Sequence, residues 1–395
     1  MISLECCSCS SKFDGFPPRH TCEKCGGLLE YMYDYERFRN ARFVGKFSFW
    51  RYRPFMPEVK NVVSMGEGGT PLHRAQRLAK MVESGGLYFK DETRNPTNSF
   101  RDRCAALLVS NALDLGYKSI VCATNGNLGA SLAAYCAKFG LSCHVVVPKS
   151  VDVGKLAQML IYNAAIEEHG EIVDEALKKA GEIAKETGWY QGSVELNPLA
   201  VEALKTIAYE VFEQMGVPEW FIVPMGSGGT LYAIWKGFKE ILRLGLIDKI
   251  PRMLAVQALG SSPILRAYKS GVYEPFKEPR TIASAIRIGN PVHWRRVLRV
   301  IEESRGAVVG VDDSEIIRAH KEIARLEGLG LETSSSTTLA GLKKALEDKV
   351  VDRGENAILV ATGHALKEPE IIDSYDLELI KVDSVNDLIS ILSKL

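Results

Sequence analysis

The sequence has 395 residues, 46% of them hydrophobic. A chain of this length and composition is expected to form two large globular lobes, or two lobes with an accessory module. Lys and Arg number 49, as do Asp and Glu, and this balance argues against nucleic acid or anionic membranes as partners. The apolar runs are far shorter than a membrane span, and the first residues lack the pattern of a secretory signal. We therefore expect a cytoplasmic protein.

Five of the nine cysteines lie within the first 25 residues. Cys6 and Cys9 form one CxxC pair, and Cys22 and Cys25 form a second one twelve residues later. This spacing is typical of a zinc ribbon, in which four thiolates complete the tetrahedral coordination of a structural ion. Cys7 is a competing ligand within the first pair, and a set of reduced surface cysteines is the alternative interpretation. We expect a structural zinc site in an N-terminal module.

Beyond residue 87, short apolar segments alternate with amphipathic helices. Residues 173–184, for example, carry apolar side chains at helical spacing and charges on the opposite face. Such alternation predicts parallel sheets that are covered by helices on both faces. The expected strands are residues 88–92, 119–124, 143–148, 220–225, 252–259 and 357–362.

Three turns that follow predicted strands have sequences suited to ligand binding, because ligands of parallel sheets bind at the carboxyl ends of the strands. The first turn, TNGNLGAS, spans residues 124–131. Its backbone amides and the side chains of Thr124, Asn125 and Asn127 are suited to a carboxylate or a phenolic oxygen. An ordinary capped turn is the alternative interpretation.

The second turn, PMGSGGT, precedes a predicted helix and can present consecutive amides to a phosphate. It matches neither GxxxxGK[ST] nor GxGxxG, so a nucleotide site is poorly supported, and a plain glycine turn is the alternative. In the third turn, ATGHALKEP, Thr362 ends a predicted strand and is suited to bonding a ring nitrogen. The candidate phosphate-binding residues are Gly226, Ser227, Gly228, Gly229 and Thr230.

Taken in chain order, these motifs resemble those of the threonine synthases, a family of pyridoxal-phosphate enzymes of fold type II. The ribbon and the motifs WRY and TGHxLK favour this family over the serine dehydratases and cysteine synthases of the same fold. The similarity extends over residues 4–370. The motifs that carry it are CxxC…CxxCGG, WRY, KDE, NPTxSFxDR, GNxGAS, VPxGxGGT, IxxGNPVxW and TGHxLK.

The resemblance implies two parallel-sheet α/β lobes with the cofactor pocket between them, joined to a zinc-ribbon-like module. We expect the module to span residues 1–38, the large domain residues 39–104 and 206–395, and the small domain residues 105–205. The resemblance also implies a homodimer with a small-molecule partner. The family reaction converts O-phosphohomoserine and water into threonine and phosphate, so that partner is expected to be a phospho-amino acid.

The resemblance further assigns roles to individual residues. The GSGGT loop is expected to hold the phosphate of pyridoxal phosphate, Thr362 to bond the pyridine nitrogen, and Asn127 to contact the 3-oxygen of the ring. The TNGN turn, which contains Thr124 and Asn125, is expected to receive the substrate carboxylate. The expected ligands of the substrate phosphate are Lys90 and Arg103.

Arg101 departs from the family at the position of the lysine that forms the Schiff base with the cofactor. A guanidinium stays charged at all accessible pH and is a poor nucleophile, so Arg101 cannot form the aldimine. It is instead suited to pair with a cofactor or substrate phosphate, because it binds anions through two parallel hydrogen bonds. Lys90 is a weak candidate to replace the missing amine.

Further departures lie nearby and favour natural divergence over a single designed change. Asn98 and Cys104 stand where the family usually has glycine, and Asn125 and Leu128 stand where it usually has a hydroxyl residue. Three hypotheses remain open. The first is an active lyase in which Lys90 or an external amine supplies the chemistry. The second is a lysine-less relative that binds the cofactor, or its amino-acid adduct, as a sensor or partner subunit. The third is a phospho-amino-acid site whose chemistry needs no aldimine.

Overall fold

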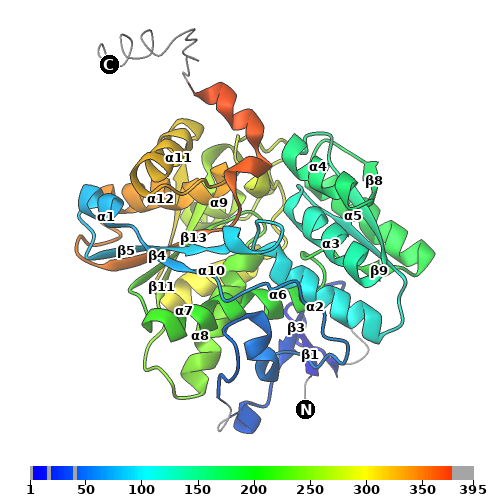
Figure 1. Ribbon diagram of the computed structural model, residues 1–395. Coiled ribbons are helices and arrows are strands. Elements are labelled where there is room, and N and C mark those ends of the chain that lie inside the picture. Colours follow the sequence, from blue (N-terminus) through cyan, green and yellow to red (C-terminus); the bar gives the residue numbers. More distant parts are fainter. Residues whose placement is uncertain (1–2, 16–18, 39–41, 376–395) are drawn as a thin grey trace.

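The computed structural model describes residues 3–15, 19–38 and 42–375, whose strands form three separate sheets (Figure 1). Near the N-terminus lies an antiparallel sheet of order β2-β1-β3, made of β1 (Ser3–Cys6), β2 (Lys12–Asp14) and β3 (Leu29–Met32). No helix in the described part of the chain is long and apolar enough to cross a membrane.

The largest sheet has six strands in the order β12-β11-β10-β13-β5-β4. Neighbouring strands are parallel except for β4, which pairs antiparallel with β5 at one edge. The central strands are nearly continuous apolar runs, as expected for a parallel sheet that is buried on both faces. The strands are β4 (Leu72–Arg74), β5 (Gly86–Asp91), β10 (Trp220–Pro224), β11 (Arg252–Ala258), β12 (Ala307–Val311) and β13 (Asn356–Ala361).

The third sheet is built from one continuous stretch of the chain and has the order β8-β7-β6-β9, with all neighbours parallel. Helices α3, α4 and α5 gather around this sheet (Figure 1). Its strands are β6 (Ser119–Ala123), β7 (Ser142–Val147), β8 (Ala165–Glu168) and β9 (Tyr190–Gln191).

Twelve α-helices and seven short 3-10 helices connect and cover the sheets in the described ranges. The α-helices are α1 (Gln76–Val82), α2 (Arg101–Asp114), α3 (Asn127–Phe139), α4 (Val153–Ile161), α5 (Val173–Thr187), α6 (Leu199–Leu204), α7 (Thr206–Met215), α8 (Gly229–Arg243), α9 (Pro263–Ser270), α10 (Trp294–Ser304), α11 (Asp313–Glu327) and α12 (Thr333–Glu347). The 3-10 helices are η1 (Tyr35–Phe38), η2 (Phe49–Phe55), η3 (Glu92–Arg94), η4 (Leu259–Ser261), η5 (Ser284–Ile286), η6 (Ala365–Lys367) and η7 (Pro369–Ser374).

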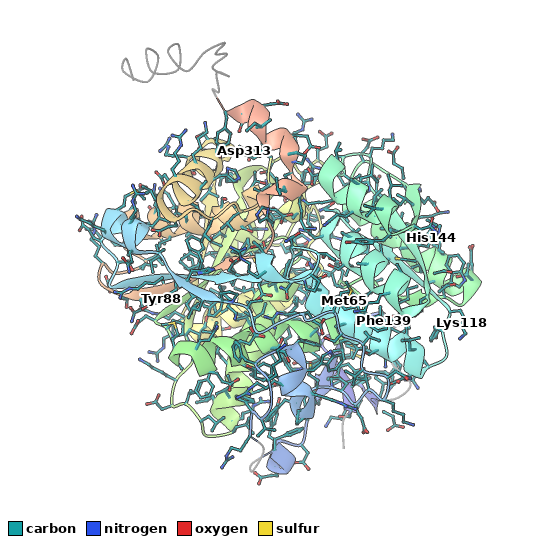
Figure 2. The ribbon with its side chains drawn as sticks, in the orientation of Figure 1. Met65, Tyr88, Lys118, Phe139, His144 and Asp313 are labelled. Atoms are coloured by element: carbon teal, nitrogen blue, oxygen red, sulfur yellow. The ribbon has the colours of Figure 1, made fainter. Side chains whose placement is uncertain are left out.

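Side chains fill the space between helices and sheets (Figure 2). Phe89 of β5, Ile222 of β10 and Leu359 of β13 are fully buried at the centre of the large sheet. Because burial of each such side chain contributes about 1.5–3 kcal/mol, these strands form a stiff platform for the turns at their carboxyl ends. The N-terminal sheet is tied to this platform by α8, where Lys236 Nζ donates to the carbonyl oxygen of Tyr31 in β3 (2.7 Å).

The six predicted strands are all present, and the predicted helix at 173–184 is α5, which continues to Thr187. The sequence did not predict β4, β8, β9 and β12, which lie at sheet edges and are short or interrupted by polar residues or glycine. The three sheets fall within the three predicted domain segments, although the exact division stays a prediction. Residues 1–2, 16–18, 39–41 and 376–395, which those segments include, lie outside the described residues.

Candidate active site

A pocket lies where turns from the large and small sheets meet. One wall comes from the turn after β6, in the small sheet, and the facing walls come from the turns after β10 and β13, in the large sheet. This is the arrangement expected when the carboxyl ends of parallel strands converge. The predicted site residues that line the pocket are Arg101, Thr124, Asn125, Asn127, Gly226, Ser227, Gly228, Thr230 and Thr362.

The turn after β10 is shaped as an anion-binding loop. It leads directly into α8, a helix of 15 residues that begins at Gly229, so the partial positive charge of the helix N-terminus faces the loop. Gly228 has a left-handed backbone (φ +88°), and a Cβ atom there would lie 2.4 Å from Cγ2 of Val297. Both features require glycine. The loop therefore has the geometry to bind a phosphate.

Two polar atoms in the pocket wall lack protein partners. The Nδ2 group of Asn127 donates to both carboxylate oxygens of Glu332 (2.8 and 2.9 Å), which leaves the buried Oδ1 atom unpartnered. The Oγ atom of Ser334, at the start of α12, is also buried and unpartnered. Close by, Oγ1 of Thr362 bonds Oγ of Ser335 (2.8 Å). Because buried polar atoms are normally hydrogen-bonded, this wall fits a ligand ring that carries polar atoms.

Glu332 and Ser334 were not predicted as site residues. Their segment reads ETSSST, and a run of hydroxyl residues at a helix start is more often local capping than a ligand site. The sequence carries no usable signal for this role, because only the structure shows that so many hydroxyl residues are buried together.

Arg101 begins α2 and lines the pocket. Its guanidinium lies over the ring of Phe100, 4.4 Å from the ring centroid. No lysine is among the described residues that line the pocket. The phosphate loop and the polar wall thus fit pyridoxal phosphate, whereas the amine that would bond it covalently is missing from the pocket wall.

The structure places Lys90 and Arg103 in a buried ion-pair network, and neither residue lines the pocket. Lys90 is fully buried, and its Nζ atom donates to the carbonyl oxygen of Thr70 (2.7 Å), Oε2 of Glu210 (2.7 Å) and Oε1 of Gln214 (3.0 Å). These three bonds use all the donors of an ammonium group. Lys90 is absent from the pocket lining, so it is not placed to replace the missing amine.

Arg103 belongs to the same buried network. Its Nε atom donates to Glu92 (2.7 Å) and its Nη1 atom to Glu210 (2.6 Å). Burial alone raises the pKa of Glu210, but Arg103 and Lys90 outweigh that effect and hold the pKa well below its usual range. The two cations therefore neutralise buried carboxylates in the protein interior and do not face a substrate phosphate.

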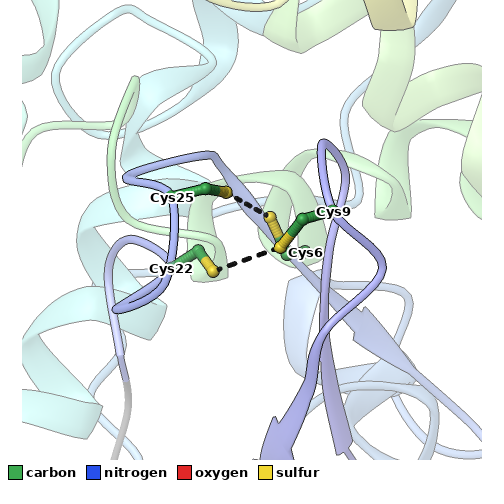
Figure 3. A group of neighbouring side chains, drawn as sticks. All are labelled: Cys6, Cys9, Cys22 and Cys25. Atoms are coloured by element: carbon green, nitrogen blue, oxygen red, sulfur yellow. Dashed lines mark hydrogen bonds between the residues drawn. The ribbon is translucent and has the colours of Figure 1, made fainter.

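The four predicted metal ligands come together beside the N-terminal sheet, where Cys6 ends β1 and the other three lie in turns (Figure 3). The Sγ atoms of Cys6 and Cys25 are 3.4 Å apart, those of Cys9 and Cys22 are 3.7 Å apart, and all four lie within 4.8 Å of one another. Zn–S bonds of about 2.3 Å in a tetrahedral site correspond to S–S distances of about 3.8 Å. Cys7 points elsewhere and accepts a hydrogen bond from Nη2 of Arg296 (2.7 Å), so the cluster fits one ion without it.

Comparison with known proteins identifies the family. Residues 63–363 match the family model described as pyridoxal-phosphate dependent enzyme. The chain is 41% identical to a threonine synthase of Methanocaldococcus jannaschii over 99% of both chains, and 38% identical to a threonine synthase of Methanosarcina acetivorans over 98% of both chains. Among solved structures, a fungal L-serine ammonia-lyase from Rhizomucor miehei has the same fold, with a TM-score of 0.68 at 19% identity, covering 78% of this chain and 96% of that chain. The chain therefore belongs to the threonine synthase family of pyridoxal-phosphate-dependent enzymes.

Proposed function

We propose that this chain is a threonine-synthase-type protein that binds pyridoxal phosphate reversibly, without a covalent bond to a lysine, together with a phospho-amino acid. One observation carries the proposal. The pocket gathers eight of the nine predicted contacts of the cofactor and the substrate carboxylate, and it is also lined by Arg101, which the resemblance aligns with the Schiff-base lysine of the family. Gly229, the ninth, is the first residue of α8.

Different residues of the pocket bind different parts of the cofactor and the substrate. The amides that follow β10 hold the phosphate at the start of α8. Thr362 and Ser334 supply hydroxyl groups to the ring, and Asn127, fixed by Glu332, supplies an acceptor. The cofactor would withdraw electrons only from an amino acid that is bonded to it through nitrogen. Thr124 and Asn125, on the small-sheet side, are placed to hold the substrate carboxylate.

The family reaction itself, from O-phosphohomoserine and water to threonine and phosphate, is the second candidate function. It is favoured by the identity of 41% over 99% of both chains with a relative named threonine synthase. This activity needs a proton carrier other than Arg101, because a guanidinium does not give up its proton in a protein. Formation of threonine from O-phosphohomoserine by the purified protein would establish the second candidate.

Absorbance and mass measurements test the cofactor proposal. The purified protein is titrated with pyridoxal phosphate, treated with borohydride, digested and analysed by mass spectrometry. We expect saturable binding that dialysis reverses, and no cofactor mass on any pocket peptide. A reduced adduct on a lysine would overturn the proposal and would make ordinary lyase chemistry the better explanation.

We also propose that Cys6, Cys9, Cys22 and Cys25 hold a structural zinc ion, because their sulfur atoms are spaced for tetrahedral coordination. None of the nine cysteines, all of which lie in the described ranges, forms a disulfide, which supports a reducing compartment such as the cytoplasm. A homodimer is expected from the family, and sedimentation analysis of the purified protein tests it.

A further inference from the structure

Two opposite charges face the same pocket. Among the residues that line it in the described part of the chain, Arg101 is the only cation and Glu195 is the only carboxylate. Arg101 begins α2, whereas Glu195 lies in the loop between β9 and α6. Neither the resemblance to threonine synthases nor the motifs of the sequence assigned a role to Glu195.

The two charges do not neutralise each other. No described residue forms an ion pair with either side chain, and the described contacts of the guanidinium are the Phe100 ring and the Cys104 thiol. Burial raises the pKa of Glu195, Arg101 partly opposes this effect, and Asp174 adds to it. The two charges therefore influence each other across the pocket without direct contact.

Two charges that lack ion-pair partners favour a ligand that carries the opposite charges. Both residues are half-buried, so each charge is partly removed from water. An oppositely charged group that binds beside such a charge recovers part of the free energy that this desolvation costs. Because the pocket carries one unpaired charge of each sign, the ligand that suits it carries both signs as well. A free α-amino acid, which has an ammonium group and at least one anionic group, meets this requirement.

We propose that Arg101 and Glu195 form a zwitterion-binding pair, in which the guanidinium binds an anionic group and the carboxylate binds the ammonium group of an intact amino acid. This inference rests on the proposed function, because an amino acid keeps its ammonium group only while its nitrogen is not bonded to the cofactor. In the protein free of cofactor, the loop after β10 is open to a second anionic group, so O-phospho-amino acids suit the pocket.

Calorimetric titration of the full chain, dialysed free of cofactor, tests the pair. The probes are O-phospho-L-serine, its N-acetyl derivative and inorganic phosphate. N-acetylation removes the ammonium group and keeps both anionic groups, so we expect at least about tenfold weaker binding to the wild type, equivalent to about 1.4 kcal/mol. In Glu195→Gln this difference between the two probes should disappear, whereas Arg101→Met should weaken binding of both.

A matched control separates the pair from general charge effects. Glu186 lies on the exposed end of α5, so Glu186→Gln removes the same charge away from the pocket and should leave the tenfold difference intact. Equal binding of the two O-phosphoserine probes to the wild type would overturn the inference without any variant having to fold. The inference would also be overturned if N-acetylation still weakened binding tenfold in a folded Glu195→Gln protein. The inference would also be overturned if O-phospho-L-serine did not bind at concentrations up to about 10 mM.

Failure of this inference is distinguishable from failure of the proposed function. Cofactor binding is followed separately, by the absorbance of pyridoxal phosphate with and without borohydride. If the protein binds the cofactor reversibly but binds O-phospho-L-serine and its N-acetyl derivative equally well, only the zwitterion-binding pair is contradicted. A protein with a covalently bonded cofactor contradicts the proposed function.

Discussion

Replacing Gly228 by alanine is the sharpest test of the phosphate loop. A Cβ atom at this position would lie 2.4 Å from Cγ2 of Val297, and the backbone there is left-handed (φ +88°). A left-handed backbone with a side chain costs about 1–2 kcal/mol, and overpacking a filled site adds about 1–3 kcal/mol. The free energy of unfolding should therefore fall by about 2–5 kcal/mol unless the loop moves.

Movement of the loop would relieve that clash at the expense of the anion site. Each hydrogen bond to a charged phosphate contributes about 1.5–3 kcal/mol, so losing one should weaken binding of pyridoxal phosphate roughly tenfold to hundredfold. Urea unfolding and cofactor titration measure the two effects on the same sample.

Gly245 provides the matched control for this experiment. It also has a left-handed backbone (φ +70°), but an added Cβ atom would meet open space. Gly245→Ala should lose about 1–2 kcal/mol of stability and bind the cofactor normally. If Gly228→Ala loses no more stability than Gly245→Ala and keeps wild-type affinity, the turn after β10 is only a turn and the reasoning is refuted.

Four further predictions follow from the same geometry. Arg101→Lys should create a visible absorbance band that borohydride fixes to the new lysine, and its absence in a folded, cofactor-binding variant would contradict the proposed position of the ring. Cys22→Ser should abolish zinc in elemental analysis and lower solubility more than cofactor affinity, and full zinc content would exclude the four-cysteine site. Glu210→Gln should cost about 3–5 kcal/mol in urea unfolding, because Lys90 loses its ion-pair partner and Arg103 loses one of its two, and a loss below about 1 kcal/mol would contradict the buried network. Affinity for O-phospho-L-serine should fall as the pH falls through the raised pKa of Glu195, since protonation removes the charge that pairs with the ammonium group, and a pH-independent titration would contradict this role.

The sequence predicted where the site lies because the location depends on local patterns. The turns at Thr124, Gly226 and Thr362 each follow an apolar run that is long enough to be a buried strand, and parallel strands bring such turns to one edge. The metal ligands could be predicted equally well, since two CxxC pairs can supply the four ligands of one ion almost regardless of the surrounding fold.

The direction in which a charged side chain points could not be predicted in this way. Lys90 begins the family motif KDE and was expected to face the substrate, but its carboxylate partner, Glu210, lies on a helix 120 residues later in the chain. Glu195 shows the opposite error, because it lies in a loop without a motif and yet reaches the pocket. A single sequence does not reveal which distant residue neutralises a charge.

The position of β13 within the large sheet has a consequence for how the protein is made. This strand, Asn356–Ala361, lies between β10 and β5, which are synthesised long before it. The small sheet, by contrast, is complete once β9 has left the ribosome. Until the last tenth of the chain emerges, β5 lacks its parallel neighbour, and the pocket lacks Thr362. Nascent chains therefore carry an open sheet edge for most of their synthesis, which is a state prone to aggregation and suited to chaperone binding.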